Sequence, residues 1–289
     1  MLGDYKNKVI IALDFNNIES AKDLTEKLKG EVYFYKVGLE LFLNSGKEII
    51  VFLKDSGYKI FLDLKFYDIP NTVYHAVKSA GLLGADIINI HASGGIEMMK
   101  AAKKGLLEAE DVAGKKIELF AVTVLTSFSS DDLKEIFYCN KNGNGNINNS
   151  KLNHNNFENR HTGGNYTRGR QNKLINGKDG ENIAENIALH LAGLAKISGV
   201  DGVVCSPLES MSIKKMFGDD FKTITPGIRL EENGIIKQND DQKRIMTPAK
   251  AFESKADYIV VGRHVTRAAD PLLSLKNIYK DIQNGYLNK

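Results

Sequence analysis

The chain has 289 residues, 42% hydrophobic and 26% charged, with a formal net charge of +3. At about 150 residues per domain it fits one large or two ordinary domains, and a composition typical of globular chains excludes wholesale disorder. No run approaches the roughly 20 apolar residues of a membrane span, and the polar start predicts no signal peptide. Cys139 and Cys205 lack the neighbouring Cys or His residues of a disulfide or zinc framework. A reducing, cytoplasmic setting is therefore expected.

Short runs rich in Val, Ile, Phe and Tyr alternate with longer stretches of helical spacing, which is the pattern of repeated βα units and a parallel sheet. Several runs are almost wholly apolar, as in strands that are buried on both faces. The predicted strands are Val9–Leu13, Val32–Val37, Lys59–Leu64, Asp86–Ile90, Ile117–Leu125, Gly202–Cys205, Lys222–Thr225 and Tyr258–Val261.

Eight βα units predict an α/β chain that forms one closed (β/α)8 barrel, a TIM barrel, as a single domain over residues 1–289. A doubly wound open sheet is the alternative. That fold normally has a Gly-rich turn after its first strand, whereas this chain has Asp14-Phe15-Asn16-Asn17 there.

One segment interrupts this alternation. Residues 140–180 contain 13 Asn and carry a net charge of +5, which leaves the other 248 residues at −2. A polar tract of this kind cannot bury enough apolar surface to offset its chain entropy, so a disordered insertion is expected. The remaining acidic body gives no electrostatic reason to bind nucleic acid or membrane. After the insertion, the spacing of Ile183, Ile187, Leu191 and Leu194 predicts a helix.

Polar residues lie at or just beyond the carboxyl end of every predicted strand, where the catalytic groups of such barrels are found. They are Asp14, Lys36, Asp63 with Lys65, His91, Thr126, Ser206, Arg229, and Gly262 with Arg263. A single polar residue at a strand end is usually only where the chain meets water. Their joint occurrence predicts an active site.

The densest group is Asp63, Lys65 and Asp68. Side chains two apart on a strand share a face, so Asp63 and Lys65 are expected to point together into the barrel mouth. Carboxylates beside an ammonium keep it protonated, which suits proton donation to a carbanion. A buried ion-pair network that only stabilises the barrel is an equal alternative for this pattern alone. Magnesium binding by the carboxylates and Asp14 is a third interpretation, which the intervening lysine disfavours.

A second group closes the last strand. Gly262 permits close approach of backbone N–H groups to an anion, and Arg263 supplies a bidentate cation. The loops after strands seven and eight commonly bind phosphate in these barrels. Arg229, near the end of strand seven, adds another cation. A substrate that bears a phosphate is therefore predicted.

The run Phe61–Thr72 resembles the signature of the orotidine 5′-phosphate decarboxylase family. Other segments resemble that family's motifs in the same order: Ile11–Asp14, Tyr35–Gly38, Asn89–Ala92, Ala121–Thr126, Asp201–Ser206, Thr225–Arg229 and Val260–Arg263. The resemblance implies cofactor-independent decarboxylation of orotidine 5′-phosphate to UMP. It also implies a homodimer with its active sites at the interface, and no nucleic-acid or membrane partner.

The same resemblance implies a role for each matching residue. Lys65 is expected to protonate C6 of the pyrimidine and Asp63 to face the departing carboxylate. Lys36 and Asp14 are expected to hold the ribose and complete the charged network, and Thr126 is expected to contact the base. Asp68 and Thr72 are expected to reach the neighbouring subunit's site. The residues expected around the phosphate are Arg229, Gln242, Gly262 and Arg263. His91 is expected near the mouth, without a catalytic assignment.

Two other functions stay open at this point. A related barrel enzyme could act on a sugar phosphate with magnesium, although the Ile69–Thr72 continuation disfavours it. Alternatively, a non-catalytic barrel could bind nucleotides or RNA through the basic Asn-rich segment, which the full set of charged site residues disfavours.

Overall fold

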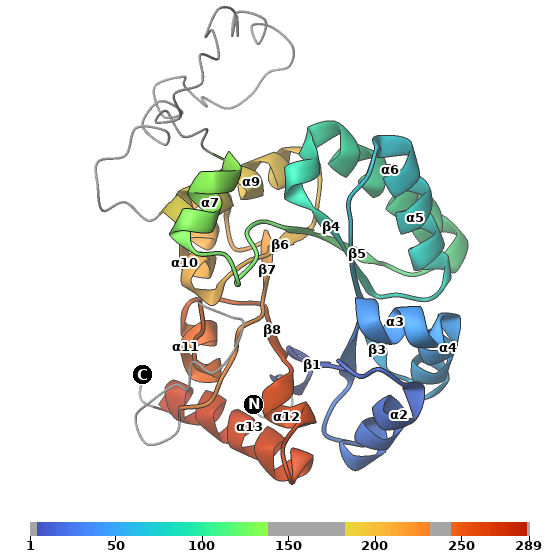
Figure 1. Cartoon of the computed structure of the whole chain (residues 1–289), viewed down its shortest axis with the longest axis vertical. Coiled ribbons are helices and arrows are strands. Elements are labelled where there is room, and N and C mark those ends of the chain that lie inside the picture. The colour runs from blue at the N-terminus through green and yellow to red at the C-terminus, as the bar shows by residue number, and fades with distance from the viewer. Residues whose placement is uncertain (1–4, 138–182, 232–243, 288–289) are drawn as a thin grey trace, which may run out of the picture. The chain divides into compact units, whose positions relative to one another are not determined.

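Eight parallel strands close into one barrel in the computed structural model of the chain, with neighbours in sequence order and β8 paired back onto β1. The structure describes residues 5–137, 183–231 and 244–287. Figure 1 shows the strands at the centre of the barrel and helices outside them. The predicted (β/α)8 barrel is confirmed.

The strands are β1 (Val9–Ala12), β2 (Phe34–Gly38), β3 (Lys59–Phe66), β4 (Ile87–His91), β5 (Glu118–Val122), β6 (Gly202–Val204), β7 (Lys222–Thr225) and β8 (Tyr258–Val261). The described helices are α2 (Ile18–Lys27), α3 (Leu39–Ser45), α4 (Lys47–Asp55), α5 (Pro70–Leu82), the short 3-10 helix η1 (Ala92–Gly94), α6 (Gly95–Ala113), α7 (Ser130–Phe137), α9 (Ile183–Ile197), α10 (Pro207–Phe217), α11 (Pro248–Glu253), α12 (Arg263–Thr266) and α13 (Pro271–Leu287).

All eight predicted strands are present, as is the helix predicted after the insertion, but two strand ends were wrong. β5 ends at Val122 instead of Leu125, because the carbonyls of Val124 and Leu125 accept hydrogen bonds from the Arg244 side chain, at 3.1 and 3.0 Å. β3 continues beyond Leu64 to Phe66 through an irregularity in its pairing with β4. The other bounds differ by one or two residues at most.

Contacts divide the chain into two units, Met1–Phe128 with Ile187–Lys289, and Ser129–Asn186. The first unit contains all eight strands. Residues 138–182 of the second lie outside the described residues. The insertion at 140–180 and the single interrupted domain therefore stay predictions.

Every strand contributes to the buried interior of the barrel. The cluster consists of Ile10, Ala12, Phe34, Phe61, Ile87, Phe120, Val122, Val204, Ile224 and Val260. Phe61 and Phe120 are among the largest side chains that are fully buried. Such a filled interior leaves polar chemistry only at the ends of the barrel.

Three aspartates join neighbouring strands where the strands begin. Asp86, Asp201 and Asp257 directly precede β4, β6 and β8. Their carboxylates accept the N–H groups of Ile60, Leu119 and Thr223 on the preceding strand, at 2.8, 2.9 and 2.7 Å. Each carboxylate also pairs with at least one lysine. These charge-assisted hydrogen bonds fix the register at the amino ends, opposite the predicted site.

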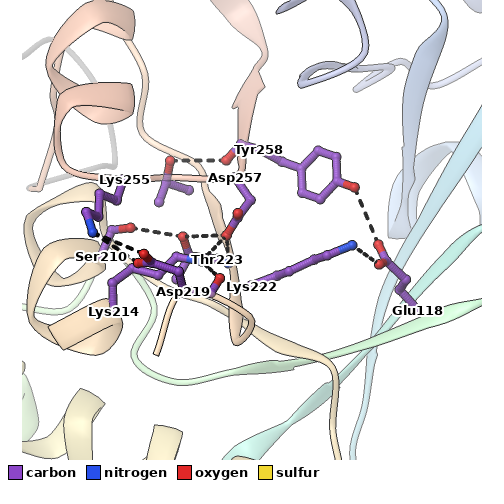
Figure 2. A network of polar contacts seen from close by, with 10 residues as sticks. Glu118, Ser210, Lys214, Asp219, Lys222, Thr223, Lys255, Asp257 and Tyr258 are labelled. Carbon is purple, nitrogen blue, oxygen red and sulfur yellow. Dashed lines mark hydrogen bonds and ion pairs between the residues drawn. The ribbon is translucent and has the colours of Figure 1, made fainter. Parts of the chain in front are cut away.

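Figure 2 shows the Asp257 junction. The carboxylate lies 2.6 Å from Nζ of Lys214, and Oγ1 of Thr223 lies 2.9 Å from Oγ of Ser210. In the same view Lys222 pairs with Glu118, which links β7 to β5. The charged groups at this end are paired with one another, as expected of a stabilising network.

Candidate active site

A cavity of about 300 Å³ opens at the carboxyl ends of the strands. Eight of the residues expected at the site line it: Asp14, Lys36, Asp63, Lys65, Thr126, Arg229, Gly262 and Arg263. Much of the remaining wall is apolar, with contributions from Phe61, Val122, Leu125 and Val260. Convergent charges in an otherwise apolar cavity are typical of a site for a small polar ligand.

Asp63 lies between two lysines. Its Oδ1 accepts a hydrogen bond from Nζ of Lys65 at 2.6 Å, and its Oδ2 lies 3.2 Å from Nζ of Lys36. Lys36 also donates to Oδ1 of Asp14, at 2.9 Å. The four side chains thus form a row of alternating charge across the ends of β1, β2 and β3.

Burial and pairing act in opposite directions on the two inner members of this row. Burial alone would lower the pKa of Lys36, but the carboxylates of Asp63 and Asp14 outweigh it, so that the pKa is raised. Burial likewise acts to raise the pKa of Asp63, and Lys36 and Lys65, with hydrogen bonds from Lys65 and Asn89, lower it below its usual value. Both groups are therefore charged at neutral pH.

The outer lysine is the more accessible of the two. The side chain of Lys65 is 31% exposed, compared with 10% for Lys36 and 11% for Asp63. A ligand in the cavity can therefore meet the Lys65 ammonium, while Lys36 lies deeper and holds Asp63 in place.

The backbone at Lys65 is unusual. Its φ is 52°, in the left-handed region of backbone conformation that residues other than glycine rarely adopt. The pairing passes from Leu62↔Ile88 to Phe66↔Ile90, so four residues of β3 advance against two of β4. Two extra residues in β3 thus form a bulge that contains Lys65, and a strained backbone of this kind is common where a side chain is aimed at a functional site.

The predicted anion-binding groups line the cavity at the ends of β7 and β8. Because β8 pairs with β1, they adjoin the Asp14 end of the charged row. Gly262 precedes the short helix α12, and Arg263 is its first residue. Arg229 follows β7, where its N–H donates to the Met246 carbonyl at 3.0 Å and Nη1 donates to the Ile228 carbonyl at 2.8 Å. Two arginines from neighbouring strand ends thus line one wall.

The remaining predicted residues lie elsewhere. Asp68 and Thr72 are exposed, in the loop after β3 and the first turn of α5, and neither lines the cavity. The Asp68 carboxylate accepts the N–H of Ile69 at 2.6 Å. Gln242 lies outside the described residues. His91 ends β4 with its ring 5.7 Å from that of Tyr67, and burial together with Lys65 lowers its pKa.

Two buried polar residues next to the cavity were missed from the sequence. Asn89 on β4 contacts both Asp63 and Lys65. Arg244 pairs with Glu209 of α10 and donates to the carbonyls of Val124 and Leu125, which line the cavity. A polar residue in the apolar run of β4 was a signal for Asn89, but nothing in the sequence marked Arg244.

Neither a metal-binding cluster nor a membrane-spanning helix is found among the described residues. No group of three His, Cys, Asp or Glu side chains is arranged to hold a metal ion there. Nor does any helix in that part of the chain have the length and apolar character to cross a bilayer.

The chain was compared with known families and proteins. The model of the orotidine 5′-phosphate decarboxylase / HUMPS family matches residues 7–147 and 166–278. A protein named orotidine 5′-phosphate decarboxylase from Bacillus cereus is 38% identical over 270 residues, which cover 93% of this chain and 94% of that protein. One of the same name from Trichlorobacter lovleyi is 38% identical over 280 residues, 97% of each chain.

The chain is also similar to solved structures. The crystal structure of orotidine 5′-phosphate decarboxylase from Lactobacillus acidophilus matches with a TM-score of 0.70 at 37% identity, over 96% of this chain and 99% of that one. An uncharacterized conserved protein from Geobacillus kaustophilus matches with a TM-score of 0.69 at 33% identity, over 95% and 99% of the two chains.

Proposed function

Since the chain belongs to the orotidine 5′-phosphate decarboxylase / HUMPS family, we propose that it decarboxylates orotidine 5′-phosphate to UMP in pyrimidine biosynthesis, with Lys65 as the proton donor. The observation that supports this most directly is the row Asp14, Lys36, Asp63 and Lys65, which lines the same cavity as two arginines. A pyrimidine nucleotide has its base at one end and its phosphate at the other, so that the base can lie against Lys65 while the phosphate lies against the arginines.

The chemistry requires the C6–carboxylate bond to break, so that CO₂ leaves and the electron pair stays on C6. Lys65 then gives its proton to C6, and the neutral amine regains a proton from solvent. A fixed ammonium beside the carbanion stabilises the transition state as well as supplying the proton. This role agrees with the partial exposure of Lys65 in the cavity.

Asp63 is proposed to face the carboxylate that leaves. Because Lys36 and Lys65 flank Asp63, the Asp63 carboxylate stays negatively charged at neutral pH. Lys36 and Asp14 would contact the ribose, since they are hydrogen-bonded to each other at the end of the row away from Lys65. Thr126, a buried residue of the loop after β5, would contact the base.

Phosphate binding is proposed for Arg229, Arg263 and the backbone N–H of Gly262, which line the cavity at the ends of β7 and β8. The sequence prediction adds Gln242. Binding energy from a phosphate remote from C6 can help to orient the pyrimidine against Lys65.

We further propose a homodimer in which Asp68 and Thr72 enter the partner's site. Asp68 is flanked by Tyr67 and Ile69, whose side chains are 60% and 66% exposed. A subunit packed against this loop would cover both apolar side chains, which supports the proposed interface. As an enzyme of nucleotide synthesis, the protein is proposed to act in the cytoplasm.

The test is incubation of the purified protein with orotidine 5′-phosphate in the presence of EDTA. Loss of the orotate absorbance and formation of UMP are expected. UMP formation only after magnesium is restored would contradict a cofactor-independent reaction. Absence of UMP under both conditions would exclude the proposed reaction and leave the metal-dependent sugar-phosphate enzyme as the alternative.

A further inference from the structure

We propose that Asn89 is a positioning residue, whose amide fills the β3 bulge and holds Asp63 and Lys65 in their reactive arrangement. The proposal rests on the function given above. Asn89 is uncharged and fully buried, and it does not line the cavity.

Asn89 joins the two reactive residues directly. Its Nδ2 donates to Oδ1 of Asp63 at 2.6 Å, and its Oδ1 accepts the backbone N–H of Lys65 at 2.8 Å. The side chain is completely buried. One amide therefore contacts a catalytic carboxylate and the backbone that carries the catalytic ammonium.

The position of Asn89 in the sheet explains why an amide is needed. It lies between Ile88 and Ile90, the two β4 residues that bracket the bulge in the register. The bulge prevents Lys65 from making the usual ladder contact, and a buried N–H without an acceptor is costly. The Asn89 side chain supplies that acceptor, and so stabilises the left-handed backbone at φ 52°.

The orientation of the amide is fixed by its partners. A backbone N–H can only donate, so it requires the oxygen, and an ionised carboxylate can only accept, so it requires the nitrogen. At neutral pH no other side chain of similar size carries a donor and an acceptor on two separate atoms. Aspartate lacks the donor when it is ionised, and leucine lacks both.

Oδ1 of Asp63 accepts from both Asn89 and Lys65, each at 2.6 Å. The amide thus fixes the rotation of the carboxylate, which in turn fixes Nζ of Lys65. Loss of the amide is expected to misplace the proton donor without changing the phosphate-binding wall. Its effect should therefore fall on the chemical step.

The first test is Asn89→Leu. We expect kcat to fall by about 100-fold, the cost of a small misplacement of a reacting group, while the Kd for UMP, measured by calorimetry, changes by no more than about threefold. The matched control is Thr223→Val. Thr223 is also fully buried and hydrogen-bonded, at the opposite end of the barrel, so its loss should lower thermal stability and leave kcat unchanged.

The second test is Asn89→Asp, which preserves shape. When ionised, the new carboxylate repels Asp63, but when protonated it can donate to Asp63 as the amide does. The titratable groups around it are Asp63 and Lys65, with Lys36 and His91 beyond them. The kcat of this variant, relative to wild type, should rise as the pH is lowered from 8 towards 5, and a merely structural role would not produce that change.

These outcomes separate the two proposals. If wild type makes no UMP, the proposed function is wrong, whatever Asn89 does. If wild type is active and Asn89→Leu keeps kcat within about threefold, or loses kcat and UMP affinity together as in partial unfolding, the positioning role is wrong. Should the leucine variant not fold, a pH profile of Asn89→Asp parallel to that of wild type would equally overturn it.

Discussion

Lys65 and Asp63 are two residues apart on β3, and Nζ of the lysine lies 2.6 Å from Oδ1 of the carboxylate. A pair this close could be only a structural ion pair. Here, however, the carboxylate has a second, deeper cation in Lys36, at 3.2 Å. Lys65 can therefore turn to a ligand without leaving Asp63 unpaired, which is what a proton donor requires.

The first prediction separates chemistry from binding. Lys65→Ala is expected to lower kcat by about 10⁴-fold, because the variant has neither the proton donor nor the cation beside the carbanion. UMP should still bind, since the arginines are intact. Arg263→Ala should instead weaken UMP binding by roughly 10- to 100-fold, the loss of a charge-assisted contact to phosphate.

Titration calorimetry with UMP and steady-state kinetics with orotidine 5′-phosphate measure both effects. Equal UMP affinity in wild type and Arg263→Ala would contradict the phosphate assignment. A Lys65→Ala variant with kcat near that of wild type would contradict the proton-donor assignment.

The second prediction concerns pH. The pKa of Asp63 is lowered in the folded protein, so this carboxylate contributes stability above its unfolded pKa of about 3.9, and the contribution is lost as the pH falls through the folded value. The pKa of Lys36 is raised; its contribution is complete below about pH 10.4 and is lost as the pH rises through its folded value.

Lys36→Met removes one of the two cations that lower the pKa of Asp63. The acid limb of thermal stability, measured between pH 3 and 7, should therefore move to higher pH. Lys29→Met is the control, since Lys29 pairs with Glu26 at the surface, with side chains 68% and 73% exposed, and exposed pairs contribute little. Coincident acid limbs in wild type and Lys36→Met would show that Asp63 does not depend on Lys36.

The third prediction concerns the buried pair of Arg244 and Glu209. Arg244→Met leaves the Glu209 carboxylate buried without its cation, which should lower the free energy of unfolding by about 3–5 kcal/mol. The double variant Arg244→Met with Glu209→Gln should lose less free energy of unfolding than the sum of the losses in the two single variants, because the two residues are coupled.

Arg244→Lys keeps the charge but not the planar fork that reaches the Val124 and Leu125 carbonyls. Since these residues line the cavity beside Thr126, kcat/KM should fall by about 10-fold. Urea unfolding and steady-state kinetics provide the two measurements. Additive losses in the double-variant cycle, with unchanged kcat/KM in Arg244→Lys, would assign Arg244 no part in the site.

The sequence predicted those parts of the molecule that depend on local pattern. Apolar runs located all eight strands, and the two-residue spacing placed Asp63 and Lys65 on one face. Asn89 and Arg244 escaped notice because their partners include backbone atoms distant in the sequence, the Lys65 N–H and the Val124 carbonyl. The bulge escaped for a related reason: the register of β3 against β4 is a property of the pair of strands.

The fourth prediction concerns the Asn-rich segment. The family model leaves residues 148–165 unmatched, as expected for an insertion. Replacement of residues 140–179 by a short Gly/Ser linker should give a folded and active enzyme, because loop length changes stability only slowly, by about 0.6 kcal/mol for each doubling. A substantial loss of thermal stability or of kcat would show instead that the segment contributes to the barrel.

The last prediction tests whether Asp68 acts across a subunit interface. A Lys65→Ala chain supplies Asp68 but no proton donor, and an Asp68→Ala chain supplies the donor but no partner carboxylate. If each site takes Asp68 from the other chain, a mixed dimer contains one site with both defects and one with neither.

Mixing equal amounts of the two inactive variants, with subunit exchange verified by differently tagged chains, should therefore restore activity. Random pairing makes half of the dimers mixed, and half of their sites are intact, so about a quarter of the wild-type activity is expected for a two-fold symmetric dimer. Wild type mixed with Lys65→Ala is the control for any effect of pairing with a variant chain, since its activity should equal that of the wild-type sites present. If verified mixed dimers are no more active than the separate variants, Asp68 acts within its own chain, because only then does every site in the mixture keep a defect.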